Sequence, residues 1–181
     1  MQVYFIELEM IELYLARHGQ TVENVARIFQ GHLPGQLTDE GRCQAEALRE
    51  KLRQLEFDMI VSSDLQRCID TVQIAAGDRN LPWVKTELLR EVDWGEWTGL
   101  AINSVNIKQL PSHAETKEML YARAGKFVDF LKANFDGKRV FAVGHGLINR
   151  SVEAWLTGIP VTDLYQIPKM ENAGLRHFIL K

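Results

Sequence analysis

The chain lacks the features of a secreted, membrane-spanning or nucleic-acid-binding protein. Its 181 residues include only two cysteines, which is too few for a disulfide framework. No apolar segment is long enough to span a bilayer, and residues 1–15 carry glutamates but no basic residue, unlike a secretory signal. A net charge of −3 and the lack of a Lys/Arg block argue against a nucleic-acid surface. We therefore expect a cytoplasmic protein that binds neither nucleic acid nor membranes.

Several catalytic signatures are missing as well. The five histidines form no His-Glu-x-x-His pair, and no cluster of Asp and Glu residues suits two divalent ions. No glycine-rich loop ends in Lys-Ser or Lys-Thr, so a Walker-type nucleotide site is not expected. The Gly-x-Ser-x-Gly motif of serine hydrolases is also absent. The sequence thus predicts chemistry without a metal, another cofactor or a serine triad.

What is present is ample apolar material for one folded unit. Hydrophobic residues make up 46% of the chain, enough for a single domain over residues 1–181. Strand-like and helix-like segments alternate, and no linker, repeat or low-complexity stretch interrupts them. This alternation predicts an α/β fold with a mainly parallel central sheet and helices on both of its faces.

Apolar periodicity locates the expected elements. Strands are expected at the short apolar runs 11–16, 57–61, 140–143 and 174–180. Helices are expected where apolar residues recur at spacings of three and four, over 38–55, 65–76, 120–131 and 147–156. Thr38 fits a helix N-cap, and Cys43 and Cys68 are expected as reduced thiols on apolar helix faces. The segment 20–37 is expected to be a polar loop.

Three of these strands are followed by histidine or arginine side chains. Arg17-His18-Gly19 ends the first strand, Arg67 follows the second, and His145 stands between two glycines after the third. Because the carboxyl ends of parallel strands face one crevice, two histidines and two arginines should meet in a single pocket. Such a set of groups can take a phosphoryl group from an oxygen atom and hold it on nitrogen.

Together these motifs resemble the histidine phosphatase family, which belongs to the same superfamily as cofactor-dependent phosphoglycerate mutase. The likeness covers residues 11–180 and rests on Arg17-His18-Gly19, Ser62-Ser63 with Arg67 and Thr71, Gly144-His145-Gly146, and the segment 91–99. It implies a phosphoglycerate mutase-like fold. It also implies a metal-independent phosphomonoesterase that acts on a small phosphorylated metabolite through phosphohistidine.

His18 is the candidate nucleophile. A neutral imidazole is a competent nitrogen nucleophile at pH 7, because its unperturbed pKa is about 6.5, and two nearby arginines would keep it neutral. Arg17 and Arg67 are permanently charged forks that suit phosphate oxygens. The N-terminus of the helix that begins near Arg67 adds its own field. His145 is expected to donate a hydrogen bond to a phosphoryl oxygen.

The resemblance also assigns Glu91 as the general acid, which protonates the leaving oxygen and then activates water as a base. The residues alone do not separate it from nearby acidic side chains, namely Glu87, Asp93 and Glu96. By the same resemblance Asn24 is a phosphate-binding residue, and Gln30 and Gly31 line the pocket. Arg150 receives no assignment from the sequence.

Two other functions stay open at this point. In a phosphoglycerate mutase the phosphate returns to the substrate, but mutases carry a longer insertion than the segment 99–115, and an open pocket that admits water favours a phosphatase. A non-catalytic binding or scaffolding domain would usually lack the nucleophile or the acid, and both are present. Trp94 and Trp97 fit either a pocket wall or packing against the sheet. The sequence leaves the oligomeric state open.

Residues 1–9 stand apart from the rest of the chain. Met10 would itself be a normal start for this family, so these residues form an extra leader. The segment 3–6 fits an added edge strand, and an upstream start codon explains the leader equally well. All proposed site residues lie beyond it.

Overall fold

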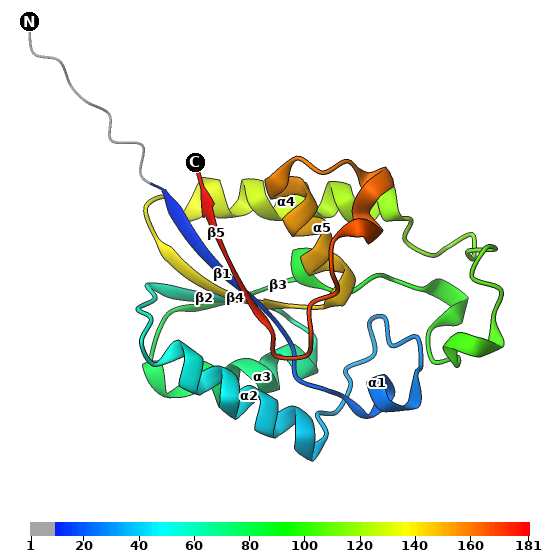
Figure 1. Cartoon of the computed structure of the whole chain (residues 1–181), viewed down its shortest axis with the longest axis horizontal. Helices are drawn as coiled ribbons and strands as arrows, with labels where there is room; N and C mark the ends of the chain where they lie inside the picture. Colours follow the sequence, from blue (N-terminus) through cyan, green and yellow to red (C-terminus); the bar gives the residue numbers. More distant parts are fainter. Residues whose placement is uncertain (1–9) are drawn as a thin grey trace, which may run out of the picture.

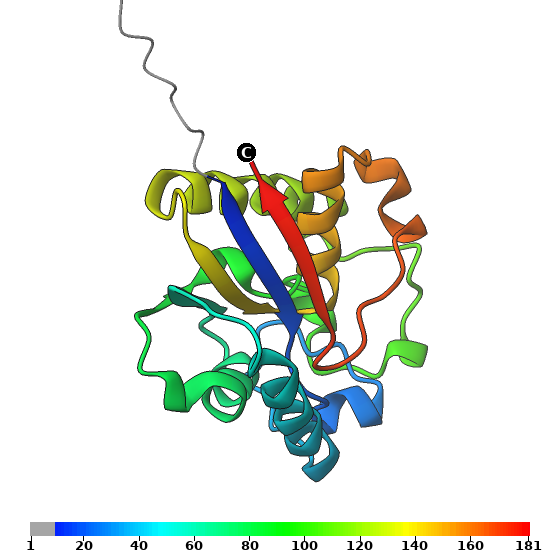
Figure 2. The same cartoon turned by 60° about the vertical axis from the view of Figure 1, so that its left-hand side comes forward.

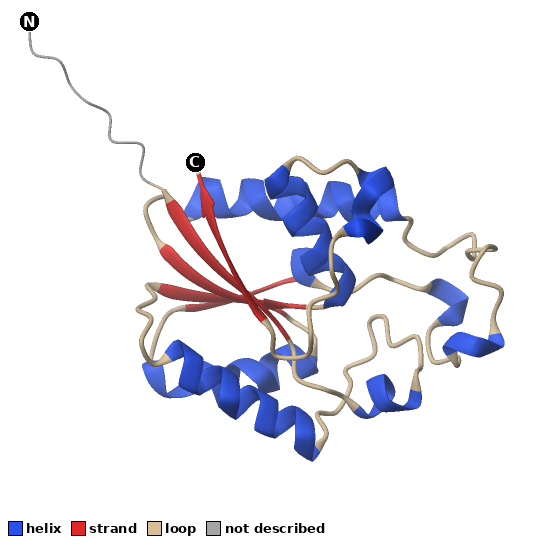
Figure 3. Ribbon diagram, in the orientation of Figure 1, coloured by secondary structure: helices blue, strands red, loops and turns tan. Residues whose placement is uncertain are grey.

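A five-stranded sheet forms the centre of residues 10–181, the part of the chain that the computed structural model describes (Figures 1 and 3). Its strands are β1 (Ile11–Arg17), β2 (Met59–Ser63), β3 (Trp83–Thr86), β4 (Arg139–Gly144) and β5 (Leu175–Leu180). They lie in the order β3-β2-β4-β1-β5, and β5 runs antiparallel to β1 at one edge (Figure 2). The other pairs are parallel, so the predicted mainly parallel α/β fold is confirmed.

Four longer helices cover the two faces of this sheet. On one face lie α2 (Asp39–Leu52) and α3 (Gln66–Ala76), and on the other lie α4 (Lys117–Asn134) and α5 (Gly146–Thr157) (Figure 1). The connections contain the short helix α1 (Val22–Ala26) and the 3-10 turns η1 (Gly77–Arg79), η2 (Glu87–Leu89), η3 (Gly95–Trp97), η4 (Ile102–Ser104) and η5 (Val161–Gln166).

Strand side chains alternate between two hydrophobic cores. On β4, Val140 and Ala142 belong to the core under α4 and α5, whereas Phe141 and Val143 belong to the core under α2 and α3. All four are fully buried, because successive side chains of a strand point to opposite faces and helices cover both. This double burial explains why such strands form continuous apolar runs in the sequence.

The start of α2 follows the prediction, but one cysteine does not. Thr38 caps the helix, since its Oγ1 accepts the N–H of Gly41 at 2.9 Å. Cys68 is buried in α3, whereas Cys43 in α2 is exposed, so the apolar environment expected for Cys43 was wrong. The buried stripe of α2 passes through Gly41, and a residue two positions later lies about 200° around the helix.

Two elements escape the sequence patterns. The short edge strand β3 was not expected, and α1 lies within the segment that was expected to be a polar loop. Several boundaries also differ: β2 begins at Met59 rather than Phe57, α2 ends at Leu52 rather than Leu55, and α4 extends beyond 120–131 at both ends. The strand considered for residues 3–6 lies outside the described residues.

Candidate active site

The carboxyl ends of the strands meet around a cavity of about 140 Å³, here called the inner pocket. The register of β1 and β4 places Arg17 beside Gly144, and the N–H of His18 donates to the Gly144 carbonyl at 3.1 Å. The pocket is lined by Arg17, His18, Asn24, Ile28, Phe29, Gln30, Gly31, Arg67, Glu91, Trp94 and Ile102. All predicted site residues therefore line it except His145.

One ring nitrogen of His18, Nε2, has no hydrogen-bond partner within residues 10–181. The other, Nδ1, lies 2.7 Å from the carbonyl oxygen of Gly19, and since a carbonyl only accepts, Nδ1 carries the proton. The lone pair of Nε2 is therefore available. Burial, followed by the charges of Arg67 and Arg17, holds the pKa of His18 well below its usual value. The ring is accordingly neutral at pH 7.

Close backbone contact fixes the loop after His18. The N–H of Gly19 donates to Thr71 Oγ1 at 3.0 Å. A Cβ atom on Gly19 would come within 2.4 Å of the carbonyl oxygen of Gly41, so the first turn of α2 packs directly on this loop. Any larger residue after His18 would push the helix away.

Arg17 points an unpaired donor toward α5. Its Nη1 donates to the Met170 carbonyl at 2.9 Å, but its Nε is buried and has no hydrogen-bond partner within residues 10–181. A Cβ atom on Gly146, in the first turn of α5, would lie 3.6 Å from this Nε and 3.5 Å from Glu91 Oε2. The donor thus lies near a helix N-terminus, where an anion is stabilised.

Arg67 is almost completely enclosed by protein groups. Its Nε donates to His145 Nδ1 at 3.0 Å, and its two terminal nitrogens donate to the carbonyls of Leu33 at 2.5 Å and Gly31 at 2.8 Å. Gly31 has a φ of +49°, a conformation that favours glycine and turns its carbonyl toward Arg67. Three of the five guanidinium N–H groups are therefore used, and two remain for a ligand.

His145 lies behind His18 and outside the pocket wall. The two ring centroids are 5.1 Å apart. Because Nδ1 of His145 accepts from Arg67, its Nε2 carries the proton and lies 2.9 Å from Ser63 Oγ. Burial, followed by the charge of Arg67, holds the pKa of His145 well below its usual value. A hydrogen bond from His145 to a phosphoryl oxygen, as predicted from the sequence, requires exchange of the Ser63 partner.

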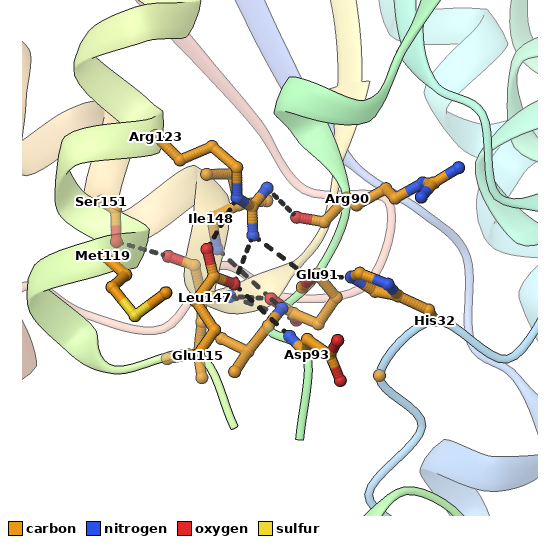
Figure 4. A network of polar contacts seen from close by, with 12 residues as sticks. His32, Arg90, Glu91, Asp93, Glu115, Met119, Arg123, Leu147, Ile148 and Ser151 are labelled. Carbon is orange, nitrogen blue, oxygen red and sulfur yellow. Dashed lines mark hydrogen bonds and ion pairs between the residues drawn. The ribbon is translucent and has the colours of Figure 1, made fainter. Parts of the chain in front are cut away.

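Glu91 is anchored at the N-terminus of α5 (Figure 4). Its Oε1 accepts backbone N–H groups at 3.1 to 3.3 Å from Val92, Leu147 and Ile148. Its Oε2 accepts only from Leu147, at 3.3 Å. Among the acidic residues considered for the general acid, Glu91 alone lines the inner pocket, while Asp93 and Glu96 are exposed.

An ion pair between Arg123 and Glu115 supports the main chain that carries Glu91 (Figure 4). The sequence does not single out this pair. Arg123 on α4 pairs with Glu115, with Nη2 and Oε2 2.7 Å apart. The same guanidinium donates to the main-chain carbonyls of Leu88 at 3.0 Å, Arg90 at 2.7 Å and Glu91 at 3.2 Å. Arg123 thus holds the backbone that carries Glu91, although in the sequence it looks like an ordinary helix cation.

Asn24 and Gln30 both line the inner pocket but differ in what they offer. Asn24 Oδ1 accepts from the N–H of Thr21 and from Asn172 Nδ2, each at 3.2 Å. Its own Nδ2 makes no hydrogen bond within residues 10–181 and is available as a donor. Gln30 uses both ends of its amide, since it donates to Glu23 at 2.9 Å and accepts from Thr21 Oγ1 at 3.1 Å. Gln30 therefore shapes the loop.

A larger cavity of about 520 Å³, here called the outer basin, adjoins the inner pocket. The two cavities share Arg17, Asn24 and Glu91 among their lining residues. The cationic side chains of the outer basin are Arg17, Arg27, Arg150 and Lys169, and its acidic ones are Glu23 and Glu91. Arg150, which the sequence left unassigned, thus borders the site.

Aromatic side chains separate the inner pocket from an apolar groove of about 510 Å³. The ring of Phe29 lies 4.8 Å from that of Trp94 and 5.3 Å from that of Trp97, measured between centroids. Trp94 lines both cavities and so walls the pocket, whereas Trp97 is 9% exposed and lines the groove only.

Residues 10–181 contain neither a candidate metal site nor a membrane-spanning helix. No group of three or more His, Cys, Asp or Glu side chains in this part of the chain could hold a metal ion. No helix there is long and apolar enough to cross a membrane. The cytoplasmic location expected from the sequence stays a prediction.

The fold and the site define an α/β protein with a buried, neutral histidine set between two arginines at the strand ends. Residues 13–181 match the model of the histidine phosphatase superfamily, branch 1. The chain belongs to this superfamily.

Named relatives agree with this assignment. The chain is 27% identical over 169 residues to the adenosylcobalamin/alpha-ribazole phosphatase of Salmonella typhimurium, covering 86% of this chain and 84% of the relative. It is 32% identical over 184 aligned residues to the glucosyl-3-phosphoglycerate phosphatase of Mycolicibacterium vanbaalenii, covering 90% and 81%. The solved structure of a mycobacterial glucosyl-3-phosphoglycerate phosphatase matches with a TM-score of 0.84 at 29% identity, covering 94% and 90% of the two chains.

Proposed function

We propose that this protein is a phosphomonoesterase that hydrolyses a small phosphorylated metabolite through a phosphohistidine intermediate. The observation that carries the proposal is the state of His18. Its Nδ1 donates to Gly19, so Nε2 offers a lone pair in a pocket that also holds the buried, unpartnered Nε of Arg17. The relatives named as phosphatases of small phosphorylated compounds support the same chemistry.

In the first step, Nε2 of His18 forms a bond to phosphorus while the bond between phosphorus and the ester oxygen breaks. An alkoxide leaves slowly, so Glu91 transfers a proton to that oxygen. The Nε of Arg17, the two free N–H groups of Arg67 and the Nδ2 of Asn24 hold the phosphoryl oxygens as their charge grows. His145 fixes the fork of Arg67 from behind.

In the second step, water hydrolyses the phosphohistidine. The Glu91 carboxylate removes a proton from the water as its oxygen bonds to phosphorus, and the phosphorus–nitrogen bond breaks. Inorganic phosphate leaves, His18 is again neutral, and Glu91 again holds the proton. Splitting one difficult transfer into two easier ones is the usual advantage of covalent catalysis.

Water access favours hydrolysis over return of the phosphate to the substrate. The inner pocket shares lining residues with the larger outer basin, and the segment 99–115 contributes only the single 3-10 turn η4 as regular structure. A phosphoglycerate mutase would need its pocket closed to water while it holds the phosphohistidine. A non-catalytic binding domain would not need the free Nε2 of His18.

Trapping the intermediate tests this proposal. Wild-type protein and His18→Ala are mixed with a ³²P-labelled alkyl phosphate and quenched within milliseconds in alkali. We expect acid-labile label on the wild type and none on His18→Ala, whose fold is checked by circular dichroism. Turnover should fall by more than about 10⁴-fold.

Three outcomes would contradict the proposal. Stable label on His18→Ala would exclude His18 as the nucleophile. Isomerised substrate without inorganic phosphate would indicate a mutase. No turnover of any ester by the wild type would indicate a binding domain.

A further inference from the structure

The outer basin carries more positive charge than one phosphoryl group requires. Its four cationic side chains form no ion pair within residues 10–181. Its two carboxylates are already engaged, since Glu23 accepts from Gln30 Nε2 at 2.9 Å and Glu91 accepts from the N-terminus of α5. The unpaired charge of this surface is therefore positive.

Two cations of the basin have a buried donor without an acceptor, Arg17 at the inner pocket and Arg150 on α5. The Nε of Arg150 is buried and has no hydrogen-bond partner within residues 10–181. Its guanidinium lies over the ring of Tyr165, 5.7 Å from the centroid, and this contact holds the group without supplying an acceptor. The guanidinium makes no hydrogen bond within residues 10–181 and lines the basin, so an anion there would give its terminal N–H groups an acceptor.

The position of Arg150 sets how far this second site lies from the phosphate. Arg150 follows Gly146 by four residues on α5, so both lie on one face of the helix, about 6 Å apart along its axis. The first turn of α5 borders the inner pocket, because a Cβ atom on Gly146 would lie 3.6 Å from Arg17 Nε. A group bound to Arg150 is thus separated from the phosphorus by a short carbon chain.

The scissile phosphate does not need Arg150. A phosphomonoester carries a charge of about −1.5 to −2 at pH 7, and Arg17 and Arg67 balance it within the inner pocket. We propose that the substrate carries a second anionic group, a carboxylate or another phosphate, on a short carbon chain, and that Arg150 and Lys169 bind this group. The inference rests on the proposed function and narrows its substrate class.

Three esters with one carbon skeleton test this substrate class. Glycerol 3-phosphate has no second anion, 3-phosphoglycerate replaces its terminal alcohol by a carboxylate, and glycerol 1,3-bisphosphate replaces it by a second phosphate. We expect kcat/KM for phosphate release to be about 10- to 100-fold higher for at least one of the latter two, as a charge-assisted hydrogen bond would provide. The preferred ester identifies the second anion.

Variants link this preference to the basin. Arg150→Gln and Lys169→Gln should each lower the preference for the doubly charged ester about tenfold. Lys126→Gln is the matched control, because it removes an exposed charge from α4 outside the basin and should leave the preference unchanged. Lys169 is exposed in the loop before β5, so its variant tests the proposal even where Arg150→Gln fails to fold.

The outcomes separate this inference from the proposed function. Equal kcat/KM values for the three esters, in a wild-type protein that hydrolyses p-nitrophenyl phosphate, would overturn the inference and leave the proposed function standing. A preference that neither variant reduces would also overturn it. No phosphate release from any ester, p-nitrophenyl phosphate included, would overturn the proposed function itself.

Discussion

The inner pocket and the outer basin adjoin each other, yet their charged groups are held in opposite ways. In the inner pocket, Arg67 makes three hydrogen bonds to protein groups and Glu91 accepts several backbone N–H groups. In the outer basin, Arg150 and Lys169 form no ion pair within residues 10–181. Groups fixed before the reaction stabilise a transition state without rearrangement, whereas unpaired cations can bind an incoming anion. The proposed function therefore assigns chemistry and substrate selectivity to different parts of this site.

The origin of these groups in the fold accounts for the contrast. His18 and Arg67 follow strands whose pairing in the sheet fixes the main chain at their ends. The basin cations other than Arg17 do not follow a strand: they lie at the C-cap of α1, within α5 and in the loop before β5. Replacing Arg150 or Lys169 should therefore change substrate preference with less effect on the chemical step.

Glu91→Gln should lower activity more than any substitution outside the inner pocket, because it removes the proposed acid while keeping the shape of the pocket. General acid–base catalysis contributes about 10²- to 10⁴-fold, so kcat for an alkyl phosphate should fall by that factor. The nitrophenolate of p-nitrophenyl phosphate leaves without a proton, so its first step should suffer far less. Phosphohistidine should then accumulate, because its hydrolysis still needs the base. Rapid-quench kinetics with both substrates measures these differences.

The same experiment can remove Glu91 from the mechanism. Equal losses on both substrates without accumulated phosphoenzyme would mean that Glu91 only shapes the pocket. A variant as fast as wild type on alkyl phosphates would exclude Glu91 altogether.

Arg123→Lys should have an intermediate effect, because it acts on the inner pocket only through the backbone of Glu91. Lysine keeps the charge near Glu115 but not the planar fork that reaches several carbonyls. A small displacement of Glu91 should lower kcat for an alkyl phosphate about 10- to 100-fold. The loss on p-nitrophenyl phosphate should be smaller, since that substrate needs no acid in its first step.

Arg139→Lys is the control for this variant. Arg139 also forms ion pairs, with Glu56 and Asp58, but it lies at the start of β4, at the opposite end of the strand from the pocket. Arg139→Lys should leave the ratio of kcat for the alkyl phosphate to kcat for p-nitrophenyl phosphate unchanged. Equal losses on both substrates in Arg123→Lys would reduce Arg123 to a structural residue.

The smallest expected effect is on stability: near neutral pH the free energy of unfolding should hardly depend on the protonation of the two buried histidines. The pKa values of His18 and His145 in the folded protein lie well below 6.5, through burial and the nearby arginine charges. Below about pH 6.5 the unfolded chain therefore binds more protons than the folded one, so the free energy of unfolding falls as the pH decreases. Above that pH the stabilisation is fully present. Each histidine contributes a slope that approaches about 1.4 kcal/mol per pH unit.

Urea unfolding between pH 5 and pH 8 measures this slope. Below pH 6.5, the free energy of unfolding of His18→Asn should depend less steeply on pH than that of the wild type, by the equivalent of up to one proton. Above pH 7 the two slopes should be equal. The same slope in the variant and the wild type would mean that His18 is protonated in the folded protein. An acid limb at pH 6.5 in the kcat/KM profile of the wild type would lead to the same conclusion.

Most of the fold could be predicted because strands buried on both faces are continuous apolar runs. β2 and β4 belong to this class, and the helices that cover the sheet were predictable from the spacing of their core positions. β3 escaped the prediction for the opposite reason. It is a four-residue edge strand whose side chains are half-buried or, at Lys85, exposed, so it forms no apolar run.

The candidate site was predictable only in part. Strand ends brought His18 and the two arginines to one pocket, because parallel strands end on the same side of a sheet. Arg123 and Arg150 gave no such signal, since each lies within a helix where a cation is ordinary. Their roles depend on which segments the finished fold places within hydrogen-bonding reach.

The sequence by itself determined the parallel sheet, the order of its apolar segments and the meeting of histidine and arginine side chains at the strand ends. These are local features, carried by periodicity and by residues adjacent to a strand. Only the tertiary structure decided which nitrogen of His18 is free, where His145 points and which carboxylate reaches the pocket. Those properties depend on hydrogen-bond partners and burial contributed by distant segments, which no spacing along the chain encodes.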